Sequence, residues 1–345
     1  MVKRAVSFFL IITLSLPFFI SCSKKEKQVY ENFNCFDTYS TLTVYGSNDE
    51  VKPFFDEFDK TLKRYHNLLD IYNTYGDTTN LKVINDNAGK EAIAVSKELF
   101  DVLEFGIEMH RKTNGKLNVA IGAVTSIWHK ARENASVSPA NVTFPTQDSI
   151  KEALSHTDIN SVLLDQKTCS VKITDPKLSL DFGGIAKGYV ASLLYNKLIS
   201  LGCKSFLINL GGNVVSAGTK PDGSSWISAI ENPFDEASLG YNKSVLLTNQ
   251  TLVTSGSYQR FFVYEGKNYS HIIDSESGFP PEFFASVTVK APSSESGLAD
   301  ALSTALFCMS FDEGSKLIAS MNNVEALWIF NDGSYKISAG FGGTN

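Results

Sequence analysis

One histidine of the chain lies among residues suited to acid–base chemistry. The sequence holds five histidines, and His271 stands in the segment Tyr-Ser-His-Ile-Ile-Asp-Ser-Glu-Ser-Gly that ends at Gly278. A neutral imidazole can take a proton from a hydroxyl near neutral pH. Asp274 is either its orienting partner or a turn former before Gly278. A lone histidine is more often structural, so the residues alone leave both roles open.

A carboxylate and a hydroxyl follow at helical spacing. Asp300 and Thr304 are four residues apart in an apolar run, so a helix would place them on one face. Phe307 projects with them, which predicts that this face is buried. A buried carboxylate needs a cation or hydrogen-bond donors, and these oxygens suit a hard ion such as Mg²⁺. The alternative is a solvated face on which Thr304 bonds back to its own helix.

Three glycine-rich turns offer backbone groups to a ligand. Residues 181–189 read DFGGIAKGY, a strand that enters a Gly-Gly turn and opens a helix, whose start favours an anion. Asp181 and Lys187 add one charge of each sign. Residues 208–213 repeat the pattern and end at Asn213, whereas residues 254–258 also suit a plain hairpin. The kinase loops and the P-loop pattern G-x-x-x-x-G-K-[ST] are absent, which excludes both families.

The elements that would position these residues mix helices with strand pairs. Periodicity predicts helices over 51–69, 97–113, 185–201 and 299–309, and strands over 36–45, 162–164, 171–173, 178–181, 206–209, 244–248, 260–264, 285–290 and 326–330. Residues 136–147 are rich in Ser, Asn, Thr and Pro and predict a loop. This mixture predicts an α+β fold of mixed or antiparallel sheets packed with helices.

Composition narrows the class of protein. The chain has 345 residues, of which 43% are apolar and 12% aromatic, as in a folded globular protein rather than a disordered one. A net charge of −6 argues against a nucleic-acid partner, because such binding rests on neutralising phosphates. No Cys–His spacing suggests a zinc site. Four cysteines beyond Cys22 allow three pairings, and Cys308 in an apolar run predicts a buried small hydrophobe.

The first residues have the pattern of a secretory signal. Lys3 and Arg4 precede an apolar run over residues 5–20, and a polar stretch begins after Cys22. A small residue followed by cysteine resembles the lipobox of bacterial lipoproteins, in which Cys22 would carry the lipid. We expect residues 1–21 to be the signal, 22–34 a polar tether and 35–345 the body. The body would be lipid-anchored in the bacterial cell envelope and face the periplasm; an uncleaved anchor helix is the alternative.

Five motifs carry a resemblance to a known family. DFGGIAKGY, INLGGN, TSGSYQRFF, SHIIDSESG and ADALSTALF, in that order, resemble the FAD:protein FMN transferase (ApbE) family. The resemblance runs from about Phe36 to the C-terminus and implies that family's T-fold-related α+β architecture. It also implies Mg²⁺-dependent transfer of FMN from FAD to a Ser or Thr hydroxyl of another protein. The product would be a phosphoester, and AMP would leave.

The resemblance assigns a role to each candidate site residue. His271 would be the base that deprotonates the acceptor hydroxyl. FAD would be held by Tyr72, Lys116, Leu117, Asn118, Asp181, Lys187, Asn213, Ser255, Gly256 and Ile272. Mg²⁺ would be held by Asp300 and Thr304, with backbone near Gly184 and Ala186. Asn118 stands where the family usually has Asp.

Two other activities remain open for the same site. The first is a Mg²⁺-dependent FAD pyrophosphatase that releases FMN and AMP, with water as the nucleophile. The second is a non-catalytic flavin-binding lipoprotein. The acceptor site of the family resembles D-G-x-[ST]-G-A-T, and residues 222–226 begin like it but lack the G-A-T ending. We therefore expect the partner to be another extracytoplasmic protein, such as a flavin-carrying subunit of a membrane redox complex.

Overall fold

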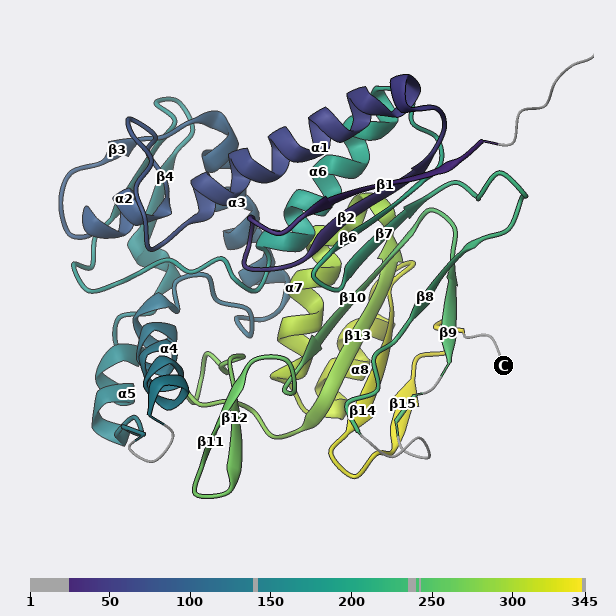
Figure 1. The fold of residues 1–345 in the computed structure, drawn as a ribbon. Coiled ribbons are helices and arrows are strands. Elements are labelled where there is room, and N and C mark those ends of the chain that lie inside the picture. Colours follow the sequence, from purple (N-terminus) through teal and green to yellow (C-terminus); the bar gives the residue numbers. More distant parts are fainter. Residues whose placement is uncertain (1–24, 139–141, 235–239, 242, 343–345) are drawn as a thin grey trace, which may run out of the picture.

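An eight-stranded antiparallel sheet forms the centre of the computed structural model, which describes residues 25–138, 142–234, 240–241 and 243–342 (Figure 1). In spatial order its strands are β1 (Lys27–Asn32), β2 (Ser40–Tyr45), β6 (Phe206–Leu210), β7 (Asn213–Ala217), β10 (Gln250–Gly256), β13 (Phe284–Pro292), β14 (Glu325–Phe330) and β15 (Tyr335–Ile337). Every neighbouring pair is antiparallel. The expected signal segment and Cys22 lie outside the described residues.

Helices cover one face of this sheet. The longest is α1 (Asn48–Leu69), beside α6 (Ala186–Ser200) and α7 (Ser296–Phe307), and α7 packs on β10 and β13 (Figure 1). Helix α8 (Phe311–Ala319) packs on β14, whereas α2 (Leu81–Asp86) packs on α1 and β5, and α3 (Lys97–Lys112) lies beside the sheet. Phe58 of α1, Leu194 of α6 and Val287 of β13 are fully buried in the main core. This burial of apolar side chains is what holds the helices on the sheet.

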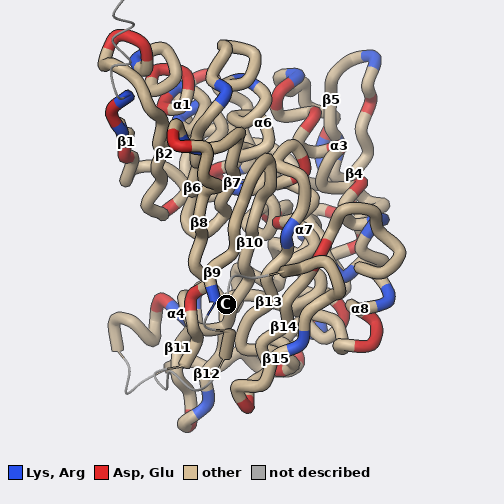
Figure 2. The backbone as a smooth tube through the Cα atoms, turned by 90° about the vertical axis from the view of Figure 1, so that its right-hand side faces the viewer, with Lys and Arg blue, Asp and Glu red and all other residues tan. Residues whose placement is uncertain are grey.

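A small sheet covers part of the opposite face. Strands β8 (Trp226–Ala229) and β9 (Ser244–Leu247) pair with each other and bury Trp226 and Leu247 against Leu252 and Leu327 of the main sheet. Figure 2 shows that the central strands β6, β7 and β10 carry no charged positions, which agrees with burial on both faces. The two-sided cover matches the layered packing of an α+β fold.

A separate aromatic cluster holds the end of the molecule that carries α4 (Gly122–Val137) and α5 (Gln147–Leu154). Strands β11 (Phe261–Tyr264) and β12 (Lys267–Ser270) form a hairpin against α4. Trp128 is buried between these elements, stacks on Tyr269 with ring centroids 5.8 Å apart, and donates from Nε1 to the Gly278 carbonyl at 2.7 Å.

The remaining described elements are a three-stranded sheet and two 3₁₀ turns. The sheet has the strand order β3 (Ile93–Ala94), β5 (Ser170–Ile173) and β4 (Val162–Asp165), and the turns are Ile159–Ser161 and Ser293–Glu295.

The structure confirms the α+β class but shifts several element boundaries. Six residues of the expected tether form β1, which pairs with β2 along its whole length. The strand expected over 36–45 begins only at Ser40, because Phe36 and Asp37 adopt left-handed φ values of 59° and 49°. Residues 178–181 make one isolated bridge, between Ser179 and Ile121, instead of a strand. The elements that were not expected are helices α2, α4, α5 and α8 and strands β3, β7, β8, β10, β12 and β15.

The described part of the chain contains no helix that is both long enough and apolar enough to cross a membrane. Its four cysteines, Cys35, Cys169, Cys203 and Cys308, are free thiols, so none of the three possible pairings is present. Cys308 is buried as expected, and burial raises the pKa of its thiol.

Helices α6 and α7 approach each other through a glycine. A Cβ on Gly188 would lie 2.4 Å from Asp300 Cβ and 2.5 Å from the Ser296 carbonyl oxygen. We predict that Gly188→Ala lowers the free energy of unfolding by about 1–3 kcal/mol, the usual cost of overpacking a core. Denaturant titration measures this. Gly183→Ala is the matched control, because its Cβ would meet only Asp181 Oδ1, at 3.2 Å. Equal stability of the two variants would contradict the prediction.

Candidate active site

The N-terminus of α6 is capped by a carboxylate from another helix. Ile185 at its N-cap offers no side-chain cap, and the N–H of Gly188 donates instead to Asp300 Oδ2 at 2.7 Å. The first N–H groups of a helix have no partner within the helix, and its dipole favours a negative charge there. The Gly-Gly turn after β5 therefore brings the DFGGIAKGY segment directly against α7.

Asp300 is buried, as its position on α7 predicts. Its residue exposure is 4%, and this burial raises the pKa of its carboxyl, opposed by the positive charge of Lys187 and the Gly188 N–H. Asn213 lies beside Asp300, and its amide also opposes this rise in pKa, although the contact between amide and carboxylate falls short of strict hydrogen-bond geometry.

Thr304 gathers further oxygen atoms next to Asp300. Its Oγ1 donates to the Gly184 carbonyl at 3.3 Å and lies 3.4 Å from Ser255 Oγ. Ser255 Oγ is in turn 2.8 Å from Ser303 Oγ. A carboxylate, three hydroxyls and a backbone carbonyl thus adjoin at this end of α6. Four of the expected metal and nucleotide residues meet here: Gly184, Ser255, Asp300 and Thr304.

Four further candidate residues are buried: Leu117, Ala186, Gly256 and Ile272. Leu117 Cδ1 would lie 3.2 Å from a Cβ on Gly184, so it borders the turn. Gly256 is buried against the ring of Tyr258. Ala186 is the first residue of α6 and is buried, and Ile272 is buried in the main core. These residues shape the site through their backbone and apolar surface.

Asp181 forms a second polar corner of the site. Its two oxygens accept hydrogen bonds from Thr125 Oγ1 at 2.7 Å and from the Gly183 N–H at 2.9 Å. The Asp181 charge acts on Tyr72, whose pKa is raised mainly by partial burial. Tyr72 is still 58% exposed, and its ring centroid lies 5.3 Å from that of His129. An exposed ring at the rim of a polar site is available to stack on a planar ligand.

His271 is held in the tautomer that a general base requires. Its Nδ1 lies 3.2 Å from the Arg260 carbonyl oxygen, which only accepts, so Nδ1 carries the proton and Nε2 is free to take one. The His271 N–H donates to the same carbonyl at 3.0 Å. Burial, followed by the positive charges of Lys187, Arg260 and Arg132, lowers the pKa of His271 to about 4. The imidazole is therefore neutral at physiological pH.

This pKa predicts an unusual acid limb in the pH profile. Because His271 stays neutral down to about pH 4, kcat/KM should fall with a midpoint near 4 rather than near the ordinary 6.5. The same shift makes stability depend on pH. Between pH 6.5, the ordinary pKa of histidine, and about pH 4, the pKa of His271 in the folded protein, only the unfolded chain takes up the proton. The free energy of unfolding therefore decreases as the pH falls through this range. A kcat/KM profile with a midpoint near 6.5 would contradict the prediction.

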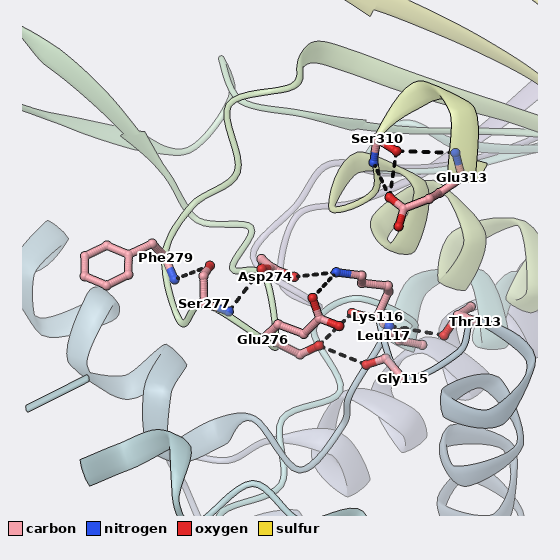
Figure 3. Close-up of polar contacts among 11 residues, drawn as sticks. Thr113, Gly115, Lys116, Leu117, Asp274, Glu276, Ser277, Phe279, Ser310 and Glu313 are labelled. Atoms are coloured by element: carbon pink, nitrogen blue, oxygen red, sulfur yellow. Dashed lines mark hydrogen bonds and ion pairs between the residues drawn. The ribbon is translucent and has the colours of Figure 1, made fainter. Parts of the chain in front are cut away.

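Two side chains that were expected to bind the nucleotide, those of Lys116 and Asn118, interact with other groups of the protein instead. Lys116 lies between Asp274 and Glu276, with Nζ–O distances of 3.5 and 2.6 Å, as Figure 3 shows. Burial would lower the pKa of Lys116, but the two carboxylates outweigh it and raise the pKa. Asn118 Nδ2 donates to the Thr157 carbonyl at 2.8 Å, and its Oδ1 accepts from the Ala120 N–H. Both side chains therefore brace the backbone around Leu117.

Asp274 does not orient His271, which was one of its two possible roles. It accepts from the Ser277 N–H at 3.1 Å, and its carbonyl accepts from the Gly278 N–H, so it forms the turn (Figure 3). The orienting group is instead a backbone carbonyl contributed by Arg260. Sequence reasoning also missed the Arg132 side chain, because nothing in the local pattern of α4 distinguishes it from a surface arginine.

The chain resembles known proteins along most of its length. The family model described as ApbE family matches residues 36–328. A FAD:protein FMN transferase of Klebsiella pneumoniae is 31% identical over 269 residues, 78% of this chain and 79% of that protein. The FAD:protein FMN transferase of Treponema pallidum is 31% identical and covers 76% of this chain and 74% of its own, and that of Vibrio cholerae is 28% identical and covers 93% and 92%.

Solved structures show the same fold. The ApbE protein of Thermotoga maritima superimposes with a TM-score of 0.79 at 24% identity, covering 92% of this chain and 98% of that one. The flavin transferase ApbE of Vibrio cholerae gives 0.73 at 23% identity and covers 91% and 97%. With the family model matching most of the sequence, the chain belongs to the ApbE family.

Proposed function

We propose that this enzyme transfers FMN from FAD to a Ser or Thr hydroxyl of an acceptor protein, with Mg²⁺ as cofactor. The observation that carries the proposal is that the charge of Lys187, on α6, acts both on a candidate base, His271, and on a candidate metal ligand, Asp300. The imidazole of His271 is neutral, and its Nδ1 faces the Arg260 carbonyl, which leaves Nε2 to take a proton. Flavin storage alone would require no such base, which favours an enzyme over a carrier.

The proposed reaction moves one proton and exchanges one bond to phosphorus. The acceptor hydroxyl oxygen attacks the FMN phosphorus of FAD, and its proton passes to His271 Nε2. The bond from that phosphorus to the bridging oxygen breaks, and AMP leaves with the electron pair. The product is a phosphoester between FMN and the acceptor. The positive charge of Lys187 and the N-terminus of α6 would stabilise the negative charge of the phosphates during this exchange.

The oxygen donors beside α6 fit a Mg²⁺ ion. Asp300, Thr304 and the Gly184 carbonyl would hold it, with Ala186 as a further backbone candidate. No group of three or more His, Cys, Asp or Glu residues is close enough to bind a metal in the described ranges. One carboxylate with neutral oxygens is nevertheless typical of Mg²⁺, which takes its other ligands from water and substrate phosphates. Bound there, the ion would neutralise negative charge on the diphosphate.

The test of this function is intact-mass spectrometry of an acceptor domain that carries D-G-x-[ST]-G-A-T. The domain is incubated with the protein, FAD and Mg²⁺, and EDTA serves as the control. A mass gain of one FMN moiety that EDTA abolishes supports the transferase. Conversion of FAD to free FMN and AMP without a mass gain would make the protein a pyrophosphatase. Intact FAD with an unchanged acceptor would overturn the catalytic proposal.

We also propose where the enzyme works. The lipobox-like pattern at Cys22 supports a lipid anchor, which would keep the protein in the cell envelope and facing the periplasm, beside an extracytoplasmic acceptor such as a membrane redox subunit. We predict that Cys22→Ser moves the protein from the membrane fraction to the soluble fraction of fractionated cells. Retention of the variant in membranes would contradict a lipid anchor at this residue.

A further inference from the structure

The hairpin of β11 and β12 presents apolar side chains on both of its faces. Phe262 and Tyr269 pack on the buried Trp128, with ring centroids 6.3 and 5.8 Å from that of the indole. Side chains alternate along a strand, so Phe261 and Val263 lie on the other face, where they remain 40% and 51% exposed. An antiparallel pair usually turns polar residues to solvent, so this exposed apolar face indicates an interaction surface.

This exposed face leads directly to His271. Phe261 pairs with Ser270 in the register of the hairpin, and the His271 N–H donates to the Arg260 carbonyl at 3.0 Å, which extends the ladder by one residue. The same carbonyl lies 3.2 Å from His271 Nδ1, and His271 keeps part of its surface accessible. In Figure 1 the hairpin projects from the body, so that its open end and not its turn lies next to the rest of the molecule.

A second exposed apolar group lies on the loop that joins β1 to β2. Phe33 and Tyr39 are 67% and 44% exposed, and their rings stack with centroids 4.8 Å apart. Arg260 Nη2 donates to the Asp37 carbonyl of this loop at 2.8 Å. One residue, Arg260, therefore contacts the loop through its side chain and His271 through its carbonyl.

The same loop also borders the side of the site that carries the candidate metal ligands. The Gly211 N–H donates to the Tyr39 carbonyl at 3.1 Å, and a Cβ on Gly211 would collide with Thr38 Oγ1. Gly211 opens the second Gly-Gly turn, which ends at Asn213 beside Asp300. The loop thus adjoins the turn next to Asp300, whereas the hairpin carries the candidate base.

We propose that the exposed apolar side chains of this loop and this hairpin dock the acceptor protein around its Ser or Thr. We call this surface the apolar rim, and its residues are Phe33, Tyr39, Phe261 and Val263. The inference rests on the proposed function and names the place where its protein substrate binds.

The position of the rim identifies the occupant. A hydroxyl within hydrogen-bond reach of His271 Nε2 brings the neighbouring residues of the acceptor against the surface around the imidazole. The two parts of the rim are connected at Arg260, so an apolar chain segment that lies across both passes the base. Exposed aromatic side chains are the residues on which such interfaces most often depend.

The first test measures docking without transfer. An acceptor domain whose modified Ser or Thr is replaced by Ala binds but cannot react, and calorimetry measures its dissociation constant. Phe33→Ser and Phe261→Ser should each raise this constant about tenfold, as the loss of an aromatic anchor does, and Phe261→Leu should restore most of the affinity. Leu246→Ser is the matched control, because Leu246 is 47% exposed on the small sheet of β8 and β9. A constant equal to that of wild type in both Phe→Ser variants would overturn the proposal.

The second test separates docking from a loss of structure. In Phe33→Ser and Phe261→Ser the KM for the acceptor should rise, while kcat, the KM for FAD and the melting temperature stay at their wild-type values. A rise in the KM for FAD, or a fall in melting temperature that accounts for the loss, would overturn the proposal. Loss of self-association or of vesicle binding with unchanged acceptor affinity would also overturn it, because another occupant would then cover the rim. If wild type transfers no FMN but the variants still weaken acceptor binding, the proposed function fails and the docking surface stands.

Discussion

His271→Asn should lower the rate of FMN transfer by about 10²–10⁴-fold, the range that a positioned general base contributes. The asparagine amide can still donate to the Arg260 carbonyl, so the segment keeps its anchor while the basic Nε2 is lost. FAD binding should stay close to wild type, because this variant leaves every candidate nucleotide-binding residue unchanged. Rates from intact-mass spectrometry and FAD affinity from fluorescence titration measure the two effects separately.

A second histidine provides the control for this variant. His156 is paired with Asp175, Nδ1 to Oδ2 at 2.8 Å, and is placed after α5, away from α6. His156→Asn should therefore leave the transfer rate unchanged. Undiminished transfer by His271→Asn would remove the base assignment. A parallel loss of FAD binding would instead indicate that His271 holds the nucleotide.

Local sequence patterns predicted those elements whose signals are themselves local. The helices expected over 97–113 and 185–201 are α3 and α6 to within one residue at each end. Ser96 caps the first by accepting from the Leu99 N–H, and apolar residues recur at helical spacing in both. The buried strand expected over 285–290 is likewise the middle of β13.

Elements stabilised by distant partners were missed. Strand β10 reads as a Thr-Ser-Gly turn, and it becomes a strand because Gln250 pairs with Pro292 and Thr251 with Val215, each about forty residues away. Strand β1 looks like a polar tether because it lies at the sheet edge, where Tyr30 packs on Phe55 and Phe58 and the buried Asn32 donates to Asp59. Nothing within either segment encodes these contacts.

The same division applies to the site. Spacing on one helix placed Asp300 and Thr304 together, and the structure brings both to the start of α6. The partner of His271 could not be found this way. Asp274 is the nearest acid in sequence. The backbone carbonyl that orients the imidazole belongs instead to Arg260, eleven residues earlier in the chain. The charge of Arg132 acts on His271 only because the tertiary fold places α4 near that residue.

Asp300→Asn should reduce transfer by about 100-fold or more and abolish its response to Mg²⁺. The charge stabilisation that a metal ion supplies is worth several kcal/mol, and each ~1.4 kcal/mol is a factor of ten in rate. The amide oxygen of asparagine can still accept from the Gly188 N–H, so the cap of α6 survives. Transfer rates are measured across a Mg²⁺ titration, with Thr304→Ser as the conservative variant that keeps a hydroxyl and Thr304→Val as the one that removes it.

Stability distinguishes this role from a structural one. Burial raises the pKa of Asp300, which means that the folded protein disfavours the ionised carboxylate. Neutralising it should therefore leave the melting temperature unchanged or raise it, while activity is lost. A carboxylate that destabilises the fold in the absence of ligand is the arrangement expected of a cation site. If Asp300→Asn instead unfolds the protein, or transfers FMN with an unaltered Mg²⁺ response, the role of the carboxylate is to cap the N-terminus of α6 and not to bind a metal ion for the reaction.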